Sequence, residues 1–215
     1  MAATQNVNYH RIMIKEIENI KARQERPRLL LHSCCAPCSS YVLEFLYEYF
    51  DIEVYFFNPN IYPENEYNKR LKEQVRLVKD MGLDYRVIGT GHESDAFYEA
   101  VKGYEHMGER SRRCHRCFEL RLDRVARYAK EFDFDYFTTT LTISPLKDAN
   151  IINEIGKRLG KKYDIPFLQS DFKKNDGYKR SIELSKKYNL YRQDYCGCVF
   201  SKREQAERHK DKIDT

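Results

Sequence analysis

Three of the chain's cysteines fall within the five-residue stretch CCAPC, residues 34–38. The apolar run LLLHS at 29–33 precedes it and is typical of a short buried strand, and residues 41–50 follow with apolar side chains at helical spacing. The thiols are therefore expected in a strand-to-helix turn, where α/β enzymes hold a phosphate loop or a nucleophile. Because the turn has no glycine to bring backbone N–H groups against a phosphate, the sequence predicts an active site that binds metal.

Apolar runs and amphipathic segments alternate along the rest of the chain. Strands are predicted at residues 29–33, 52–58, 84–90, 135–143 and 166–169. Helices are predicted at residues 9–21, 41–50, 64–81, 94–101, 114–132, 148–162, 177–188 and 199–210. This order predicts an α/β fold, with an open parallel sheet flanked by helices on both faces. Residues 1–215 are expected to form a single catalytic domain, with 1–26 as a loosely attached N-terminal segment.

The cysteine count and the N-terminus bear on the cellular compartment. The chain has 215 residues, and its seven cysteines lie in three groups, unlike the even scatter of a small secreted disulfide scaffold. The polar N-terminus lacks the apolar core of an export signal, and no apolar stretch approaches the roughly 18 residues of a membrane span. We therefore expect a reducing cytoplasm and no membrane. The net charge of +5 is compatible with a polyanionic partner without requiring one.

A second thiol pair, Cys114 and Cys117, begins a predicted helix with CxxC spacing. Free N–H groups at a helix start and adjacent arginines both stabilise thiolates. Together with Cys34 and Cys35, this pair supplies four ligands that suit an iron–sulfur cluster or a zinc site. A structural zinc ion would leave three thiols unused, so the surplus favours redox function over stabilisation of the fold.

The third group, Cys196-Gly197-Cys198, places two thiols one residue apart. A disulfide between them would close a very small, strained and easily reduced ring, and Gly197 supplies the backbone freedom it needs. Two interpretations stay open from the residues: a pair that cycles between dithiol and disulfide, or two further metal ligands. Cys38 is likewise either a buried spectator thiol or a ligand of a second metal.

The segments CCAPC (34–38), ERSRRCHRCFELRL (109–122), TTTLTISPLKD (138–148) and YRQDYCGCVFS (191–201) together resemble the QueH-type epoxyqueuosine reductases over almost the whole chain. The resemblance implies an adenine-nucleotide α-hydrolase-like fold, of the HUP or Rossmann-like kind. It implies a cobalamin-independent iron–sulfur oxidoreductase that removes the epoxide oxygen from epoxyqueuosine at the wobble position of a tRNA anticodon, the last step of queuosine biosynthesis. The implied partners are that tRNA and an electron donor that the sequence does not identify.

The resemblance also implies roles for individual cysteines. The residues that match the family's [4Fe-4S] ligands are Cys34, Cys35, Cys114 and Cys117. Cys196 and Cys198 match its redox-active pair. The family is associated with a second iron that has an acidic ligand in the first turn, and at that place this chain departs from the pattern because it carries Cys38.

Three arginines beside the second thiol pair, Arg110, Arg112 and Arg113, are the candidate contacts to tRNA phosphates. The titratable residues near the thiols in sequence, none of which is assigned as a proton donor, are His32, His115, Asp194 and Tyr195. Two other functions are weighed against the reductase. An ATP-using tRNA-modifying α-hydrolase would need a glycine-rich loop where this chain reads SCCAPCSS, and a zinc-stabilised RNA-binding module would need no iron.

Overall fold

The computed structural model describes residues 7–210, with side chains described through residue 208. Its sheet has four strands, β1 (Arg28–His32), β2 (Asp51–Phe56), β3 (Val87–Gly89) and β4 (Tyr136–Thr139). The helices of the described chain are α1 (Tyr9–Ala22), α2 (Ala36–Leu46), α3 (Glu64–Asp80), α4 (Ser94–Val101), α5 (Arg112–Glu131), the 3-10 helix η1 (Thr140–Ile143), α6 (Ala149–Tyr163), α7 (Gly177–Lys187) and α8 (Val199–Lys210). All strand pairs are parallel, in the order β3-β2-β1-β4. This is the order of the first four strands of a Rossmann sheet, so the predicted α/β fold is confirmed.

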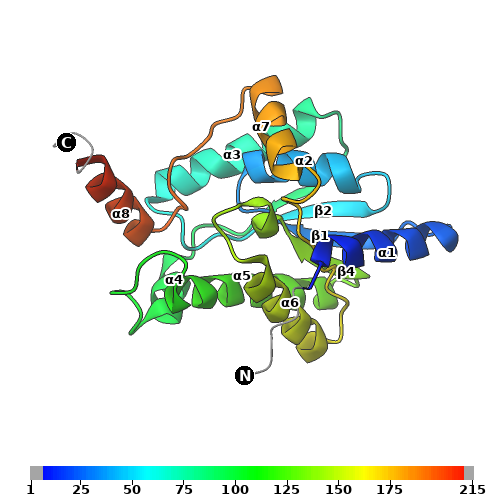
Figure 1. Ribbon diagram of the computed structural model, residues 1–215, viewed down its shortest axis with the longest axis horizontal. Helices are drawn as coiled ribbons and strands as arrows, with labels where there is room; N and C mark the ends of the chain where they lie inside the picture. Colours follow the sequence, from blue (N-terminus) through cyan, green and yellow to red (C-terminus); the bar gives the residue numbers. More distant parts are fainter. Residues whose placement is uncertain (1–6, 211–215) are drawn as a thin grey trace.

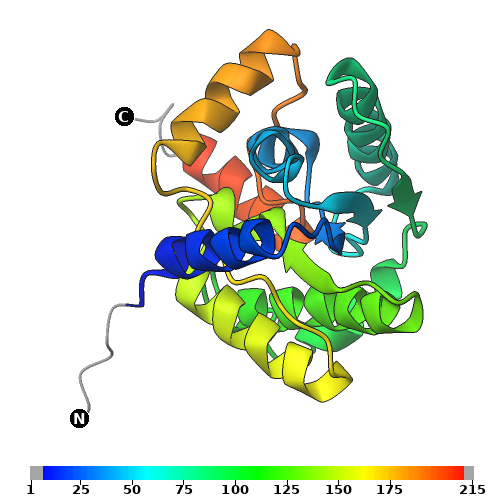
Figure 2. The same ribbon diagram turned by 90° about the vertical axis from the view of Figure 1, so that its right-hand side faces the viewer.

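Helices cover both faces of the sheet because successive residues of β1 point to opposite sides. Leu29 and Leu31 enter an apolar core with residues of α1, α2 and α3. Leu30 enters a second core with residues of α5 and α6. Figures 1 and 2 show the same two layers, with α2, α3 and α7 above the sheet and α5 and α6 below it. The site described below lies between these layers, at the carboxyl ends of the parallel strands.

The N-terminal helix is part of the core, which corrects the expectation of a loosely attached segment over residues 1–26. Met13, Ile17 and Ile20 of α1 are at most 5% exposed and pack in the same core as Leu29. Their helical spacing forms a continuous apolar face, and burial of that face fixes the helix. Residues 1–6 lie outside the described residues.

Three predicted boundaries differ from the structure for local reasons. The helix predicted over 41–50 begins at Ala36, since Pro37 is compatible with a first helical turn. The strand predicted over 135–143 ends at Thr139, whose Oγ1 accepts a hydrogen bond from the Leu141 amide at 3.1 Å and starts η1. The strand predicted over 166–169 is reduced to an isolated bridge to β4.

Candidate metal and active site

The turn after β1 and the turn after β4 meet at the carboxyl edge of the sheet. Because β2 lies on one side of β1 and β4 on the other, the strand order reverses there, and open α/β sheets bind ligands in the crevice outside such a point. Thr140 joins the two turns: its Oγ1 accepts a hydrogen bond from the Cys34 amide at 3.2 Å and donates one to Cys34 Sγ at 3.4 Å. The predicted strand-to-helix location of the CCAPC stretch is confirmed.

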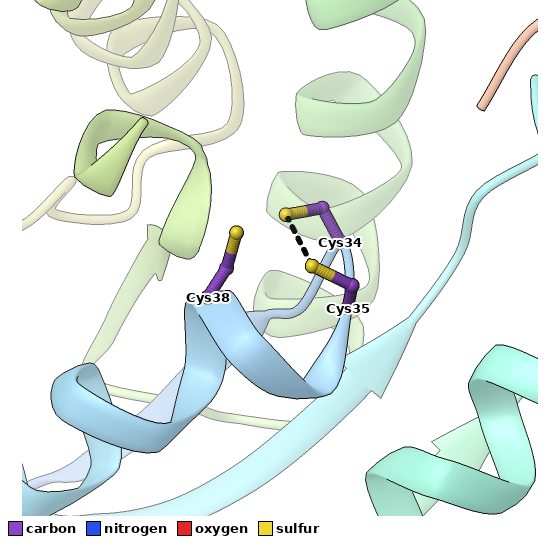
Figure 3. Close-up of side chains that lie close together, drawn as sticks. All are labelled: Cys34, Cys35 and Cys38. Carbon is purple, nitrogen blue, oxygen red and sulfur yellow. Dashed lines mark hydrogen bonds between the residues drawn. The ribbon is translucent and has the colours of Figure 1, made fainter. Parts of the chain in front are cut away.

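The three thiols of this turn form one compact group. Cys34 and Cys35 project from the turn and Cys38 from the first turn of α2, with their sulfur atoms around one space (Figure 3). Within the described chain this is the one group of three His, Cys, Asp or Glu ligand atoms that all lie within 4.8 Å of one another. The Cys34 and Cys35 sulfurs are 3.9 Å apart. Two thiolates on one tetrahedral metal with metal–sulfur bonds of about 2.3 Å are separated by roughly 3.8 Å, so the group fits a metal ion.

Negative charge is shared unequally among these thiols. Hydrogen bonds from Cys35 and Cys38 hold the pKa of Cys34 well below its usual range. The hydrogen bond to Cys34 raises the pKa of Cys35 to about 11, and the hydrogen bonds to Cys34 and Cys35 raise the pKa of Cys38 well above its usual range. These directions favour the thiolate on Cys34 and the protonated thiol on Cys35 and Cys38 when no metal is bound. A metal would release both protons, since thiolate is the ligating form.

A cavity of about 650 Å³ adjoins the three thiols, and Cys114 and Cys196 also line it. Cys117 and Cys198 do not line it: they are 8% and 9% exposed and pack behind it in a small apolar cluster with Phe97. The structure thus brings five of the seven thiols to one cavity and places two in the wall behind. Neither member of the CxxC pair joins the compact group of Cys34, Cys35 and Cys38.

Hydrogen bonds from two other residues fix the backbone of the Cys196-Gly197-Cys198 segment, of which Cys196 lines the cavity. Arg70 donates from Nη1 to the Cys196 carbonyl at 3.4 Å, and the Tyr62 amide donates to the Gly197 carbonyl at 2.8 Å. Gly197 has φ of 132°, a conformation that favours glycine. All seven cysteines are free, with Cys196 exposed and Cys198 buried against Ser201, so the structure gives no support to the predicted disulfide.

The three candidate arginines have different surroundings. Arg110 lines the cavity, and both it and Arg112 are exposed. Arg113 is 3% exposed, donates to Glu204 Oε1 at 2.6 Å and lies over the Phe200 ring. Its prediction as a phosphate contact is therefore corrected: the guanidinium is buried in an ion pair that ties α8 to α5.

His32 is removed from the possible proton donors by its position. It is fully buried, with Nδ1 2.8 Å from Thr139 Oγ1 and Nε2 3.2 Å from the Phe57 carbonyl. Burial lowers the pKa of His32 to about 4, so the ring is neutral and serves the packing of the sheet. The other three titratable residues predicted near the thiols line the cavity: His115, Asp194 and Tyr195.

Two cations in the cavity wall are not among the predicted site residues. Arg121 of α5 is 2% exposed, and Lys147 of the loop after η1 is half-buried. Burial lowers the pKa of Lys147, but nearby Cys196, Cys34 and Cys38 outweigh it and leave that pKa raised. A sequence signal existed for Arg121, because it lies three residues after Phe118 and four before Val125 on the predicted apolar stripe.

This fold and site define a class of protein: a Rossmann-like α/β protein with a thiol-lined cavity where the strand order reverses. A family model described as epoxyqueuosine reductase QueH matches residues 29–204. The chain therefore belongs to the QueH family, and the resemblance found in the sequence is confirmed.

Curated relatives named "Epoxyqueuosine reductase QueH" match most of the chain. The relative from Staphylococcus aureus is 47% identical over 208 residues, which cover 94% of this chain and 87% of the relative. The relative from Streptococcus pyogenes is 41% identical, covering 96% of this chain and 82% of the relative. The relative from Thermotoga maritima is 39% identical, covering 85% and 94%.

Among solved structures, the U34-tRNA thiolase NcsA from Methanococcus maripaludis with its [4Fe-4S] cluster aligns with a TM-score of 0.49 at 14% identity. That alignment covers 94% of this chain and 73% of the thiolase. None of the helices in the described chain combines the length and the apolar character needed to span a bilayer.

Proposed function

We propose that this protein reduces the epoxide of epoxyqueuosine in tRNA to the alkene of queuosine. Its family and the shared name of its relatives support this activity. The reaction takes up two electrons and two protons, breaks both C–O bonds of the epoxide and releases the oxygen as water. The observation on which the proposal chiefly rests is the cavity at the reversal of strand order, into which five thiols project.

A [4Fe-4S] cluster is the proposed redox cofactor, with Cys38 as a ligand of a second iron. The proposed cluster ligands are Cys34, Cys35, Cys114 and Cys117. The donor set fits such a group in its chemistry, because all four side chains are thiols and negative charge on Cys34, Cys114 or Cys117 would stabilise the buried Arg121 guanidinium, whose Nη2 has no hydrogen-bond partner. When bound, iron of this kind supplies electrons one at a time and can polarise an epoxide oxygen.

The chain's own residues would bind and orient the modified base. Cys196 is exposed in the cavity and is the proposed catalytic thiol, whereas Cys198 is buried behind it. Arg110, which lines the cavity, and the exposed Arg112 are the proposed phosphate contacts. His115 and Asp194 line the same space and can exchange protons with a bound ligand. A separate electron donor is the second proposed partner, beside the tRNA.

One domain in a reducing cytoplasm is the proposed setting. The cavity takes side chains from the first turn, from α5, from the loop after η1, from α7 and from residues 192–196, so separating these parts would open it. Seven free thiols are typical of a reducing compartment.

Anaerobic reconstitution with iron and sulfide tests the proposal. We expect about four irons per chain with labile sulfide, rising toward five when Cys38 holds a second iron. The reconstituted protein should convert epoxyqueuosine to queuosine in tRNA when a one-electron donor is supplied, as measured by mass spectrometry of the released nucleosides. Cys38→Ser should lose only the iron beyond the cluster.

The two other functions predict different results in the same experiment. A zinc-stabilised RNA-binding module would take up stoichiometric zinc, hold no iron and leave the nucleoside unchanged. An ATP-using modifying enzyme would require ATP and change the tRNA without an electron donor. Either result would refute the reductase.

A further inference from the structure

Arg121 holds a charge in the protein interior without a carboxylate partner. Its Nε donates to the Cys117 carbonyl at 3.1 Å, one helical turn earlier on α5. Its Nη2 is buried and has no hydrogen-bond partner. Among the side chains described through residue 208, no carboxylate oxygen lies within 4.0 Å of its guanidinium, as the ion pairs of the structure show.

The other two buried arginines make the contrast plain. Arg70 is 2% exposed and pairs with Glu66 at 2.7 Å, although its Nη2 also lacks a hydrogen-bond partner, and Arg113 is 3% exposed and pairs with Glu204 at 2.6 Å. An unpaired buried charge destabilises a fold strongly, so proteins pair such charges or place them against a bound ion. Arg121 lacks the usual partner, which points to a partner that the polypeptide alone does not supply.

Arg121 lines the same cavity as the Cys34, Cys114 and Cys196 thiols, and its guanidinium also lies 5.6 Å from the centre of the Phe118 ring. The groups whose negative charge would stabilise the guanidinium are Cys117, Cys196, Cys34 and Cys114. At 2% exposure the guanidinium lies too deep to meet a phosphate of RNA at the surface, whereas Arg110 and Arg112 are exposed. The partner of Arg121 is therefore an internal anion at the thiols.

We propose that Arg121 is a positioning residue, the buried counter-ion of an anionic metal–thiolate group held by the cavity cysteines, to which Nη2 donates an N–H···S hydrogen bond. The inference rests on the proposed iron–sulfur function. Hydrogen bonds to cluster sulfurs and compensation of the cluster's negative charge both raise its reduction potential. Arg121 thus makes the cluster easier to reduce and holds it more tightly.

Arg121→Met is the main test, because methionine keeps an apolar stem and removes the charge. In the metal-free, reduced protein we expect the Tm to stay the same or to rise by up to about 2–4 °C, since Arg121 has no carboxylate to lose and only the thiols offset its burial. In the reconstituted protein the midpoint potential should shift to a lower value, as followed by electron paramagnetic resonance during a redox titration. Iron affinity in chelator competition should fall about 10- to 100-fold. Arg121→Lys, which keeps the charge, should recover part of the potential.

Arg113→Met is the matched control on the same helix. It removes an arginine that already has a carboxylate, so the metal-free Tm should fall. The inference is overturned if Arg121→Met also lowers the metal-free Tm or fails to fold without metal, or if its cluster has the wild-type potential and affinity. Failure of the wild-type protein itself to assemble a cluster would instead refute the proposed function.

Discussion

Arg113→Met is expected to destabilise the protein while leaving the electrostatic part of tRNA binding intact. The Arg113 guanidinium donates to Glu204 at 2.6 Å and to the Glu105 carbonyl at 3.2 Å, and it lies 4.7 Å from the centre of the Phe200 ring. The side chain is 4% exposed and that of Glu204 is 28% exposed. Removing one partner of a buried pair costs about 3–5 kcal/mol, and the partial exposure of Glu204 places this pair near about 3 kcal/mol.

That loss converts into a measurable change in melting temperature. At about 2–4 °C per kcal/mol for a chain of this size, the expected fall in Tm is roughly 6–12 °C. Circular dichroism of the reduced, metal-free protein measures it. Glu204→Gln should lower the Tm in the same direction, and the double variant should lose less than the sum of the two, because both changes remove one interaction.

Arg112→Ala is the matched control, since Arg112 is the neighbouring residue and is exposed. It should leave the Tm unchanged and reduce the slope of log affinity for tRNA against log salt by about one. The reasoning is refuted if Arg113→Met keeps the wild-type Tm and lowers the salt slope, because Arg113 would then contact phosphate, as its place in the sequence indicates.

Two further predictions concern the thiols. Cys196→Ser should keep the cluster but lose turnover, because Cys196 lines the cavity, whereas Cys198→Ser should mainly lower the Tm, because Cys198 is buried. Iron content and mass spectrometry of the nucleosides distinguish the two effects. If Cys196→Ser loses the visible absorption of the cluster, Cys196 is a cluster ligand instead. Thr140→Val should weaken metal binding about 10-fold, since Thr140 bonds both the amide and the sulfur of Cys34. Thr142→Val, which removes a buried contact to Ser170 instead, is the control for chelator competition, and equal affinities in the two variants would contradict the role of Thr140.

The sheet could be predicted because its signals are local. The continuous apolar run at 29–33 and the β-branched run after residue 135 lie in strands buried on both faces, where no alternation is needed. The strand predicted from the second run is too long, because Thr140 and Ile143 are β-branched residues with a high propensity for strands. In the structure the Thr139 hydroxyl accepts a hydrogen bond from the Leu141 amide, and the chain turns so that Thr140 contacts Cys34. Strand propensity does not predict this turn, because the turn depends on tertiary contacts.

The site was predictable in its chemistry and less so in its geometry. The spacing of the cysteines predicted which segments bring thiols to the cavity. It could not show that Cys117 packs in an apolar cluster instead of lining the cavity, because that depends on how α5 is rotated against the sheet. A run of arginines beside the CxxC pair is a surface signal, and only the packing of α8 reveals that Arg113 is buried. For Arg121 the sequence predicts burial instead, because a charged residue at the helical spacing of an apolar stripe faces the protein interior.

The source of positive charge at this site explains why it suits a fixed anion better than a nucleotide. In phosphate-binding α/β proteins, free N–H groups at the start of the helix after β1 supply that charge. Here the Ser33 amide is bonded to the Tyr55 carbonyl, the Cys34 amide is bonded to Thr140, and Pro37 has no N–H. Further positive charge comes from Arg121 on α5 and Lys147 on the loop after η1, which line the cavity together with the thiols. Charge placed on a buried side chain stabilises an anion that stays in the protein, and thiolates bound to metal are such an anion.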